Sequence, residues 1–265
     1  MQIHVVRPGE TLFSVAAGYR LSPALLAGMN GVRPDAQLAV GQTLVARSPA
    51  VVHTVAPGDT VYAVARRYGT DVRALYRNNV TLSAQSVLRP GEQLVVSFAD
   101  DARIGAIGAN GYAYPYVGAA LLDTALPYLS ALTPFTYGIG VDGALLPLSD
   151  GALLASAARF GCAALMHLSS LTEEGGFSNE RSSRVLNSPA LRERLIRDVI
   201  ETLRQKGYAG LDVDFEFVFP QERELYAAFV RALRERLNPL GYPVLVALAP
   251  KTRANQPGLL YVGVT

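Results

Sequence analysis

Hydrophobic and polar positions follow the same pattern twice in the first hundred residues. The segment HVVRPGETLF at residues 4–13 recurs 49 residues later as HTVAPGDTVY at residues 53–62. In each copy, alternating positions predict a short strand, and apolar positions at helical spacing predict two helices after it. A second alternating segment, at 41–45 or 91–95, predicts a closing strand. The pattern therefore predicts two copies of a small β-α-α-β module.

Turn and cap residues mark where these helices begin. A Pro-Gly pair ends the first strand of each copy, so that Gly9 and Gly58 supply a tight turn. Side chains that accept a hydrogen bond from a helix N-terminus stand at the expected helix starts. These expected caps are Thr11, Ser22, Thr60 and Asp71. In the second copy, the residues expected to face the core are Val61, Val64, Ala65 and Tyr68.

The repeated motif resembles the LysM module in three features: the Gly-[Asp/Glu]-Thr-[Leu/Val]-aromatic turn, the Asn that ends the second helix, and the entry to the last strand. The resemblance covers nearly all of two expected domains, residues 1–47 and 52–97, joined by a short linker at 48–50. LysM modules bind chains that contain N-acetylglucosamine, such as peptidoglycan and chitin. The resemblance implies these partners here, and a groove between residues 9–13 and 29–31, with its counterpart between 58–62 and 78–79.

That groove implies a set of sugar-binding candidates: Gly9, Thr11, Asn30, Gly58, Thr60 and Asn79. The glycines and threonines have a second explanation, because the turn and the helix cap require them whether or not a sugar binds. His4 and His53 begin strands and are interpreted as structural, since two isolated histidines are poor evidence for a metal site.

From about residue 104, after a polar hinge, strand and helix patterns alternate, which predicts an α/β domain with a parallel sheet. Strands are expected at 111–115, 132–139, 163–169, 210–216 and 244–249. The clearest helix spans 189–206, because Ser188 can cap it, Pro189 suits its first position and Gly207 can end it. Another helix is expected from 220 to about 237.

The fourth expected strand carries the candidate chemistry. Its alternation places Leu211, Val213 and Phe215 on one face, and Asp212, Asp214 and Glu216 on the other, roughly 7 Å apart in succession. Three carboxylates in a row are costly to desolvate, so a solvated edge strand is the alternative explanation. A negative Asp214 would raise the pKa of Glu216, which could then donate a proton to a leaving oxygen.

Residues 209–216 read AGLDVDFE and resemble the signature Asp-Gly-x-Asp-x-Asp-x-Glu of family 18 glycoside hydrolases. Ala209 replaces the first aspartate, and this departure is expected to alter the tuning of the carboxylate row. The stretches GYAYP, LTEEGGF, GYAG and ALAPK, which begin at 111, 171, 207 and 247, are similar to the cortex-fragment-degrading N-acetylglucosaminidases of spore-forming bacteria. For residues 104–265 the resemblance implies a (β/α)8 TIM-type barrel.

The resemblance also implies a retaining, substrate-assisted mechanism. Glu216 would protonate the glycosidic oxygen, and the 2-acetamido oxygen of the substrate would attack the anomeric carbon. Asp214 would orient the acetamido N–H, and Asp212 would modulate Asp214. No metal or organic cofactor is required. Tyr112 and Tyr137 lie near strand ends and are expected to border the sugar, with a place in the core as the alternative.

Charge and composition exclude several classes of partner. The net charge of +2 is too small to indicate binding to nucleic acid or to an anionic membrane. No run of about 18 apolar residues is present, so no membrane span is expected. Cys162 lies in an apolar run and is interpreted as a buried thiol. The first residues lack a signal-peptide pattern, which suits proteins made in the mother cell and placed on the spore coat or cortex, or in the cell wall.

The length after residue 104 bears on activity. A complete (β/α)8 barrel takes about 250 residues, whereas 162 residues and about five strands are present here, with no tryptophan for a sugar floor. The sequence therefore predicts an incomplete, C-terminally truncated barrel whose carboxylates meet water and whose open edges promote self-association. Two functions stay open: a truncated N-acetylglucosaminidase, or a non-catalytic wall or spore-coat protein that binds glycan through its LysM pair.

Overall fold

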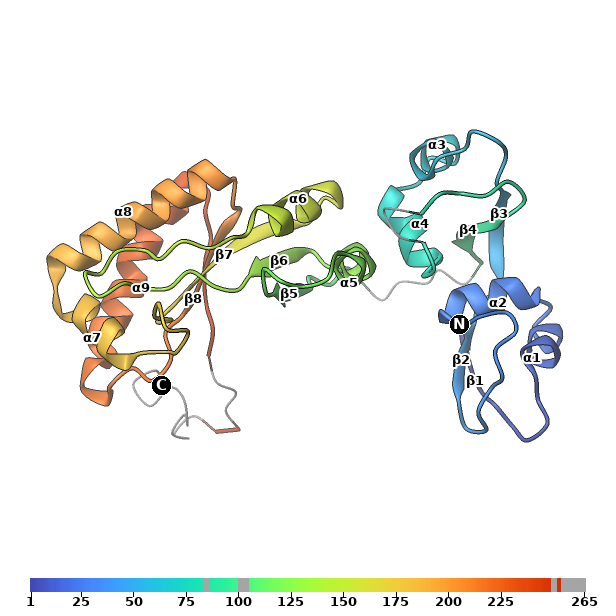
Figure 1. Ribbon diagram of the computed structural model, residues 1–265, viewed down its shortest axis with the longest axis horizontal. Helices are drawn as coiled ribbons and strands as arrows, with labels where there is room; N and C mark the ends of the chain where they lie inside the picture. The colour runs from blue at the N-terminus through green and yellow to red at the C-terminus, as the bar shows by residue number, and fades with distance from the viewer. Residues whose placement is uncertain (83–85, 100–104, 249–251, 254–265) are drawn as a thin grey trace. The chain divides into compact units, whose positions relative to one another are not determined.

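The computed structural model describes residues 1–82, 86–99, 105–248 and 252–253. The chain forms two compact units (Figure 1). The first contains Met1–Ile107 together with Gly118–Tyr128, and the second contains Gly108–Val117 together with Leu129–Thr265.

The first repeat folds as β1 (Gln2–Val5), α1 (Leu12–Gly18), α2 (Pro23–Asn30) and β2 (Thr43–Ala46), with β1 and β2 antiparallel. Both predicted caps are confirmed. The Thr11 hydroxyl accepts from the Ser14 N–H at 3.1 Å, and the Ser22 hydroxyl accepts from the Leu25 N–H at 3.2 Å. Each bond satisfies an N–H that the helix itself cannot pair. The core of the module is Val6, Leu12, Val15, Ala16, Leu26, Ala27, Leu44 and Ala46.

The second repeat folds as β3 (Pro49–Thr54), α3 (Val61–Arg67), α4 (Val72–Asn78) and β4 (Gln93–Phe98). Thr60 and Asp71 cap its helices as predicted. Tyr68 does not join the core as expected: it is 40% exposed, and its hydroxyl lies 3.2 Å from His53 Nδ1. The expected linker is also part of the fold, since Pro49 pairs with Phe98 and the Ser48 carbonyl accepts from the Ala99 N–H.

A short segment between β5 and β6 belongs to the first unit. It consists of α5 (Ala119–Ala125) and the 3-10 turn η1 (Leu126–Tyr128). The Pro127 carbonyl accepts hydrogen bonds from Arg73 and Arg77 of α4, and the Tyr128 hydroxyl donates to the Arg77 carbonyl. These bonds explain why the segment lies with the second repeat.

The second unit is built on a five-stranded parallel sheet in the order β5-β6-β7-β8-β9. The strands are β5 (Asn110–Ala113), β6 (Ala131–Pro134), β7 (Ala163–Ser169), β8 (Gly210–Asp214) and β9 (Val244–Val246). The helices between them are α6 (Gly151–Arg159), α7 (Asn179–Asn187), α8 (Pro189–Lys206) and α9 (Arg223–Leu237), with 3-10 turns η2 (Pro220–Glu222) and η3 (Asn238–Leu240). This alternation of parallel strands and helices confirms the expected partial α/β barrel.

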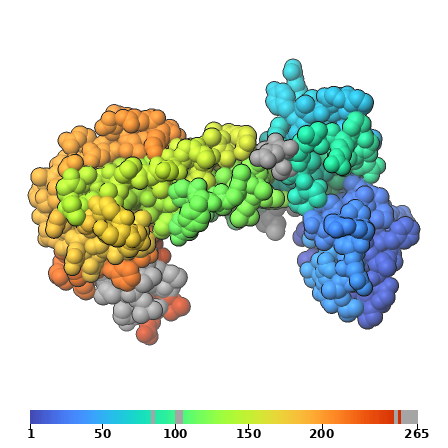
Figure 2. Space-filling view, in the orientation of Figure 1, coloured from blue at the N-terminus to red at the C-terminus, as the bar shows by residue number. Residues whose placement is uncertain are grey.

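The helices α8 and α9 cover one face of this sheet (Figure 1). Ser188 caps α8 and Gly207, with φ of 73°, ends it, as predicted. Leu211, Val213 and Phe215 of the fourth-strand segment are buried among apolar residues of both helices. The opposite, charged side of α8 forms part of the outer surface (Figure 2).

Several expected bounds differ from the structure. The second barrel strand ends at Pro134, before a cis peptide bond between Phe135 and Thr136. Beyond it, Tyr137 and Ile139 form isolated bridges, with Leu168 and Leu145. The expected helix from 220 divides into η2 and α9, and Ala228, expected inside, is exposed. Of the expected last strand, residue 249 lies outside the described residues.

Candidate active site

The two aspartates of the fourth barrel strand are buried. Asp212 is 2% exposed and Asp214 is 7% exposed, on the face of β8 opposite Leu211 and Val213. The expectation that the carboxylates meet water is therefore wrong for these two residues, because aromatic and imidazole side chains from β5 to β7 cover them. Burying carboxylates is costly unless they are paired or hydrogen-bonded.

Glu216 follows β8 and is partly buried. The backbone on both sides of it is fixed by apolar anchors, since Phe215 and Val218 are fully buried in the helix-side core. Between these anchors, Phe217 has a left-handed conformation with φ of 57°. This conformation is uncommon for a bulky side chain and turns the chain directly after Glu216.

Tyr112 of β5 holds Asp212. Its hydroxyl donates to Asp212 Oδ2 at 2.6 Å. Burial, together with this bond to a carboxylate, raises the pKa of Tyr112 well above its ordinary value near 10. The phenol therefore stays protonated at neutral pH and acts as a permanent donor to Asp212.

His167 of β7 faces Asp214. Its Nε2 atom lies 3.6 Å from Asp214 Oδ2, and its Nδ1 atom lies 2.6 Å from the Thr136 hydroxyl. The ring stacks on Phe135 and meets the edge of Tyr112, and it is 1% exposed. Sequence reasoning missed this residue, although the alternation of β7 places His167 and Ser169 on one face.

A cavity of about 370 Å³ opens beside these groups. It is lined by Tyr112, Ala113, Tyr114, Phe135, His167, Asp214 and Ala247. Tyr114 also stacks on Tyr116, and both rings are at least half exposed. A cavity with aromatic walls and a carboxylate at its base can receive a ring that has one apolar face and polar edges. Glu216 is not among the lining residues.

The binding candidates of the two repeats divide into turn, cap and helix-end residues. Gly9 and Gly58 have φ of 81° and 84°, which glycine adopts without strain. The hydroxyls of Thr11 and Thr60 accept the hydrogen bonds that cap the following helices. The Asn30 amide bonds both backbone groups of Val45, and the Asn79 amide bonds both backbone groups of Val95. All six thus have a place in the fold of the modules.

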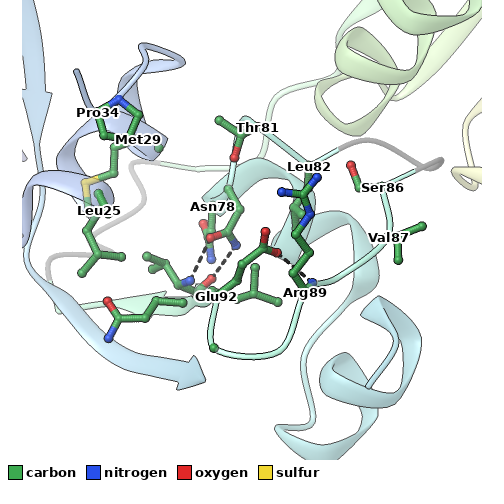
Figure 3. Close-up of a pocket in the computed structure, with 17 residues that line it drawn as sticks. Leu25, Met29, Pro34, Asn78, Thr81, Leu82, Ser86, Val87, Arg89 and Glu92 are labelled. Carbon is green, nitrogen blue, oxygen red and sulfur yellow. Dashed lines mark hydrogen bonds between the residues drawn. The ribbon is translucent and has the colours of Figure 1, made fainter. Parts of the chain in front are cut away.

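The first unit also contains a larger cavity, of about 850 Å³ (Figure 3). Its walls are α2, with Leu25 and Met29, and residues from 78–82 and 86–95, where the Glu92 carboxylate accepts from the Arg89 N–H. Asn79 lines it, but Gly58 and Thr60 do not. The structure therefore places the 78–79 side of the predicted groove of the second repeat at this cavity, and Gly58 and Thr60 outside it.

Comparison with known families fits both parts of the chain. The LysM domain model matches residues 4–47 and 53–97, and the model of glycosyl hydrolases family 18 matches residues 159–261. Two LysM domains precede a family 18 glycosyl hydrolase domain.

Three similar proteins align with nearly the whole of this chain. The chain is 32% identical over 269 residues to the cortical fragment-lytic enzyme of Bacillus subtilis (strain 168) and 29% identical over 264 residues to that of Bacillus anthracis. Each comparison covers 98% of this chain and 61% of the relative. The crystal structure of the Bacillus cereus spore cortex-lytic enzyme SleL aligns with a TM-score of 0.72 at 28% identity, over 100% of this chain and 61% of that one. The chain thus spans about three fifths of the length of these relatives.

Tyr137 does not border the cavity of the family 18 domain, contrary to expectation. It is 2% exposed, and its hydroxyl donates to Asp150 Oδ2 at 2.5 Å. Tyr208 and Lys206 bond the same carboxylate. Burial alone would raise the pKa of Asp150, but the bonds from Lys206, Tyr137 and Tyr208 outweigh it and hold that pKa below its usual value. Tyr137 therefore closes a buried polar cluster in the core.

Ala209 lies outside the carboxylate row of the family 18 domain. It is exposed just before β8, and two residues of strand, Gly210 and Leu211, separate it from Asp212 by about 10 Å. Ala209 is therefore remote from the buried pair, and the effect of the missing aspartate on tuning stays a prediction.

Cys162 and the two histidines of the LysM domains have structural roles. Cys162 is buried, as expected. His4 and His53 bond Glu10 and Asp59 within their own LysM domains, each at 2.8 Å, which agrees with a structural role. Among the residues that the structure describes, no group of three or more His, Cys, Asp or Glu side chains is placed to hold a metal ion, and no helix there is long and apolar enough to cross a membrane.

Proposed function

We propose that the family 18 domain hydrolyses glycosidic bonds of N-acetylglucosamine with retention of configuration, while the LysM domains hold the polymer. The observation that carries this proposal is the pair of buried carboxylates on β8, beside an aromatic-walled cavity and directly before Glu216. A soluble domain rarely buries two neighbouring carboxylates without a functional reason, since the free-energy cost is high.

The proposed chemistry assigns one step to each acid. Glu216 donates its proton to the glycosidic oxygen as the bond to the anomeric carbon breaks. The carbonyl oxygen of the substrate's 2-acetamido group forms the new bond to that carbon, so the enzyme needs no nucleophile of its own. Asp214 accepts the acetamido N–H and balances its growing positive charge. Water then opens the oxazolinium-type intermediate, and Glu216 recovers a proton from that water.

Tyr112 supports this chemistry through Asp212. With the phenol hydrogen fixed on Asp212 Oδ2, the negative charge of Asp212 is partly compensated, so it repels Asp214 less. The tyrosine also lines the cavity and is 55% exposed, so its ring can contact a sugar from the same position.

The relatives favour a particular polymer and place. Since they are named for lysis of spore cortex fragments, we infer that this chain acts on cortex muropeptides and resides in the spore coat or cortex. The two LysM domains would bind peptidoglycan, with chitin-type oligomers as a related ligand. Gly9, Thr11, Asn30 and their counterparts Gly58, Thr60 and Asn79 remain the proposed contacts, through backbone groups that the turns present.

The test is hydrolysis of purified cortex fragments by the 265-residue chain, followed by mass spectrometry of the products. Glu216→Gln keeps the shape of the acid but has no proton to donate, so turnover should fall by about 10²–10⁴-fold while binding to insoluble peptidoglycan persists. Glu224→Gln, on the exposed first turn of α9, is the matched control and should leave turnover unchanged. Equal rates for wild type and Glu216→Gln would remove Glu216 from the acid role.

A further inference from the structure

His167 stands at the centre of the candidate site without a role in the chemistry described so far. Three strands meet at its imidazole: Thr136 follows β6, Tyr112 belongs to β5 and Asp214 ends β8. The ring is almost fully buried and its plane is fixed by stacking on Phe135, with centroids 4.9 Å apart. Such a ring can change its charge but has little freedom to change its position.

The Thr136 hydroxyl can serve either protonation state of this imidazole. As a donor, it gives its proton to Nδ1 of a neutral ring. As an acceptor, it takes the Nδ1 hydrogen of a charged ring and donates its own proton to the carbonyl of Tyr137 or His167, or to the Ser169 hydroxyl, which lie at 3.2, 3.3 and 3.0 Å. Rotation of one hydroxyl therefore accompanies the gain or loss of the proton.

In both states Nε2 carries the hydrogen that points towards Asp214. A bare Nε2 lone pair opposite a carboxylate oxygen at 3.6 Å would be repulsive, so the tautomer with the proton on Nε2 is favoured when the ring is neutral. When the ring is charged, the same hydrogen belongs to a cation beside the two buried aspartates. Either way, the Nε2–H dipole faces Asp214 across 3.6 Å, a distance that allows electrostatic attraction but is too long for a direct hydrogen bond.

We propose that His167 is the positioning residue of the carboxylate row: its imidazole, held by Thr136, orients Asp214 through Nε2, and its protonation sets the charge beside Asp214. The titratable groups that face this ring in the described part of the chain are Tyr112 from β5 and Asp212 and Asp214 from β8. From β6 and the residues after it, Phe135 and Thr136 contribute groups that do not titrate. The role in turnover rests on the function proposed above, whereas the coupling of His167 to Asp214 does not.

The coupling can be measured without any substrate. The chain has three histidines, so a ¹⁵N-histidine NMR spectrum of the 265-residue protein resolves each imidazole. In Asp214→Asn, the ring ¹⁵N signals of His167 should change at neutral pH, because an anion 3.6 Å from Nε2 is lost. His4 and His53 keep their own carboxylate partners and serve as internal controls. Asp198→Asn, at a partly exposed site on α8, is the matched control.

Unchanged His167 ring signals in folded Asp214→Asn would overturn the proposal. If that variant does not fold, the reverse measurement decides: in His167→Gln, the ¹³C carboxyl signal of Asp214 should move, and an unmoved signal refutes the coupling. In the hydrolysis assay, His167→Gln should shift the acid limb of kcat to higher pH with little change in KM. A chain that hydrolyses nothing but shows the NMR coupling contradicts the proposed function and leaves this inference standing.

Discussion

Two histidine–carboxylate pairs in this chain differ in what the rest of the protein does with them. In the second LysM domain, His53 Nε2 lies 2.8 Å from Asp59 Oδ2, and the same carboxylate accepts from the Ala56 N–H and from Arg67. In the family 18 domain, His167 Nε2 lies 3.6 Å from Asp214 Oδ2, and both residues line a cavity. The Asp59 carboxylate stabilises a turn, whereas the Asp214 carboxylate lies at the wall of a cavity that a ligand can enter.

The difference shows why the residue type alone does not identify a site. The first LysM domain has the same arrangement as His53 and Asp59: His4 bonds Glu10, and Glu10 also accepts from the Arg7 N–H. We call such a pair closed, because its carboxylate is bonded within its own turn, and we call the His167–Asp214 pair open. A carboxylate bonded to its own turn stabilises the fold. A carboxylate that a rigid imidazole faces across a longer gap, at the wall of a cavity, is placed for binding or catalysis.

The largest expected effect on turnover comes from the open pair, His167 and Asp214. Asp214→Asn should lower kcat on cortex fragments by at least about 100-fold, because the acetamido group loses its anionic partner. Stability in urea should stay the same or rise, since a buried charge is removed. If Asp214→Asn lost stability but kept its rate, Asp214 would be a structural residue like Asp59, and the distinction between the two pairs would be wrong.

Asp150 is a carboxylate of the family 18 domain that is bonded entirely within the core, so its loss should affect stability and not catalysis. Asp150→Ala leaves Tyr137, Tyr208 and Lys206 without their shared acceptor, so unfolding of this domain should become easier by about 3 kcal/mol. Urea denaturation followed by circular dichroism measures this. Tyr137→Phe removes one bond only, and a loss as large as that of Asp150→Ala would show that the cluster does not act through its carboxylate.

The closed pair of the second LysM domain should respond to pH. The Ala56 N–H, the bond from His53 and the nearby Arg67 together hold the pKa of Asp59 below its ordinary value of 3.8, against the effect of burial. A lowered folded-state pKa adds stability that is present above the unfolded-state value and is lost as pH falls through the folded one. The protection of the Ala56 N–H against hydrogen exchange, relative to its intrinsic rate at each pH, should therefore fall below about pH 4. In Asp59→Asn this protection should be low at every pH, and hydrolysis should be unchanged.

Tyr112→Phe should have the smallest effect. The substitution removes one hydrogen bond to Asp212 but keeps the ring that lines the cavity. We expect kcat to fall by roughly tenfold and KM to stay within about twofold, since a bond to a charged group contributes about 1.5–3 kcal/mol. A large rise in KM instead would assign the hydroxyl to substrate binding.

The sequence predicted local features well because each depends on a few neighbouring residues. The caps at Thr11 and Ser188, and the alternation that buries Phe215, follow from rules that act within one turn or one strand. Tyr137 was placed wrongly because Asp150, thirteen residues later, decides its burial. The candidate site depended on similar long-range contacts.

His167 illustrates what sequence alone leaves undetermined. A histidine in an apolar run has no local signal, and its partner Asp214 lies 47 residues further along the chain. Only the register of β7 on β8, which sets His167 beside Asp212, brings the imidazole to the carboxylate row. Tyr112 could be proposed from its place near a strand end, but its bond to Asp212 spans a hundred residues.

The left-handed turn at Phe217 links the position of the adjacent Glu216 to the packing of the helix layer. This backbone conformation costs about 1–2 kcal/mol, so it persists only while its neighbours hold it. Phe215 does so by stacking on Tyr226 and Phe229 of α9, with centroids 5.8 and 5.5 Å away. Loosening that stack, for instance by Phe229→Leu, would let the turn relax and displace the adjacent Glu216. The position of Glu216, the proposed acid, therefore depends on aromatic packing on the helix side of the sheet.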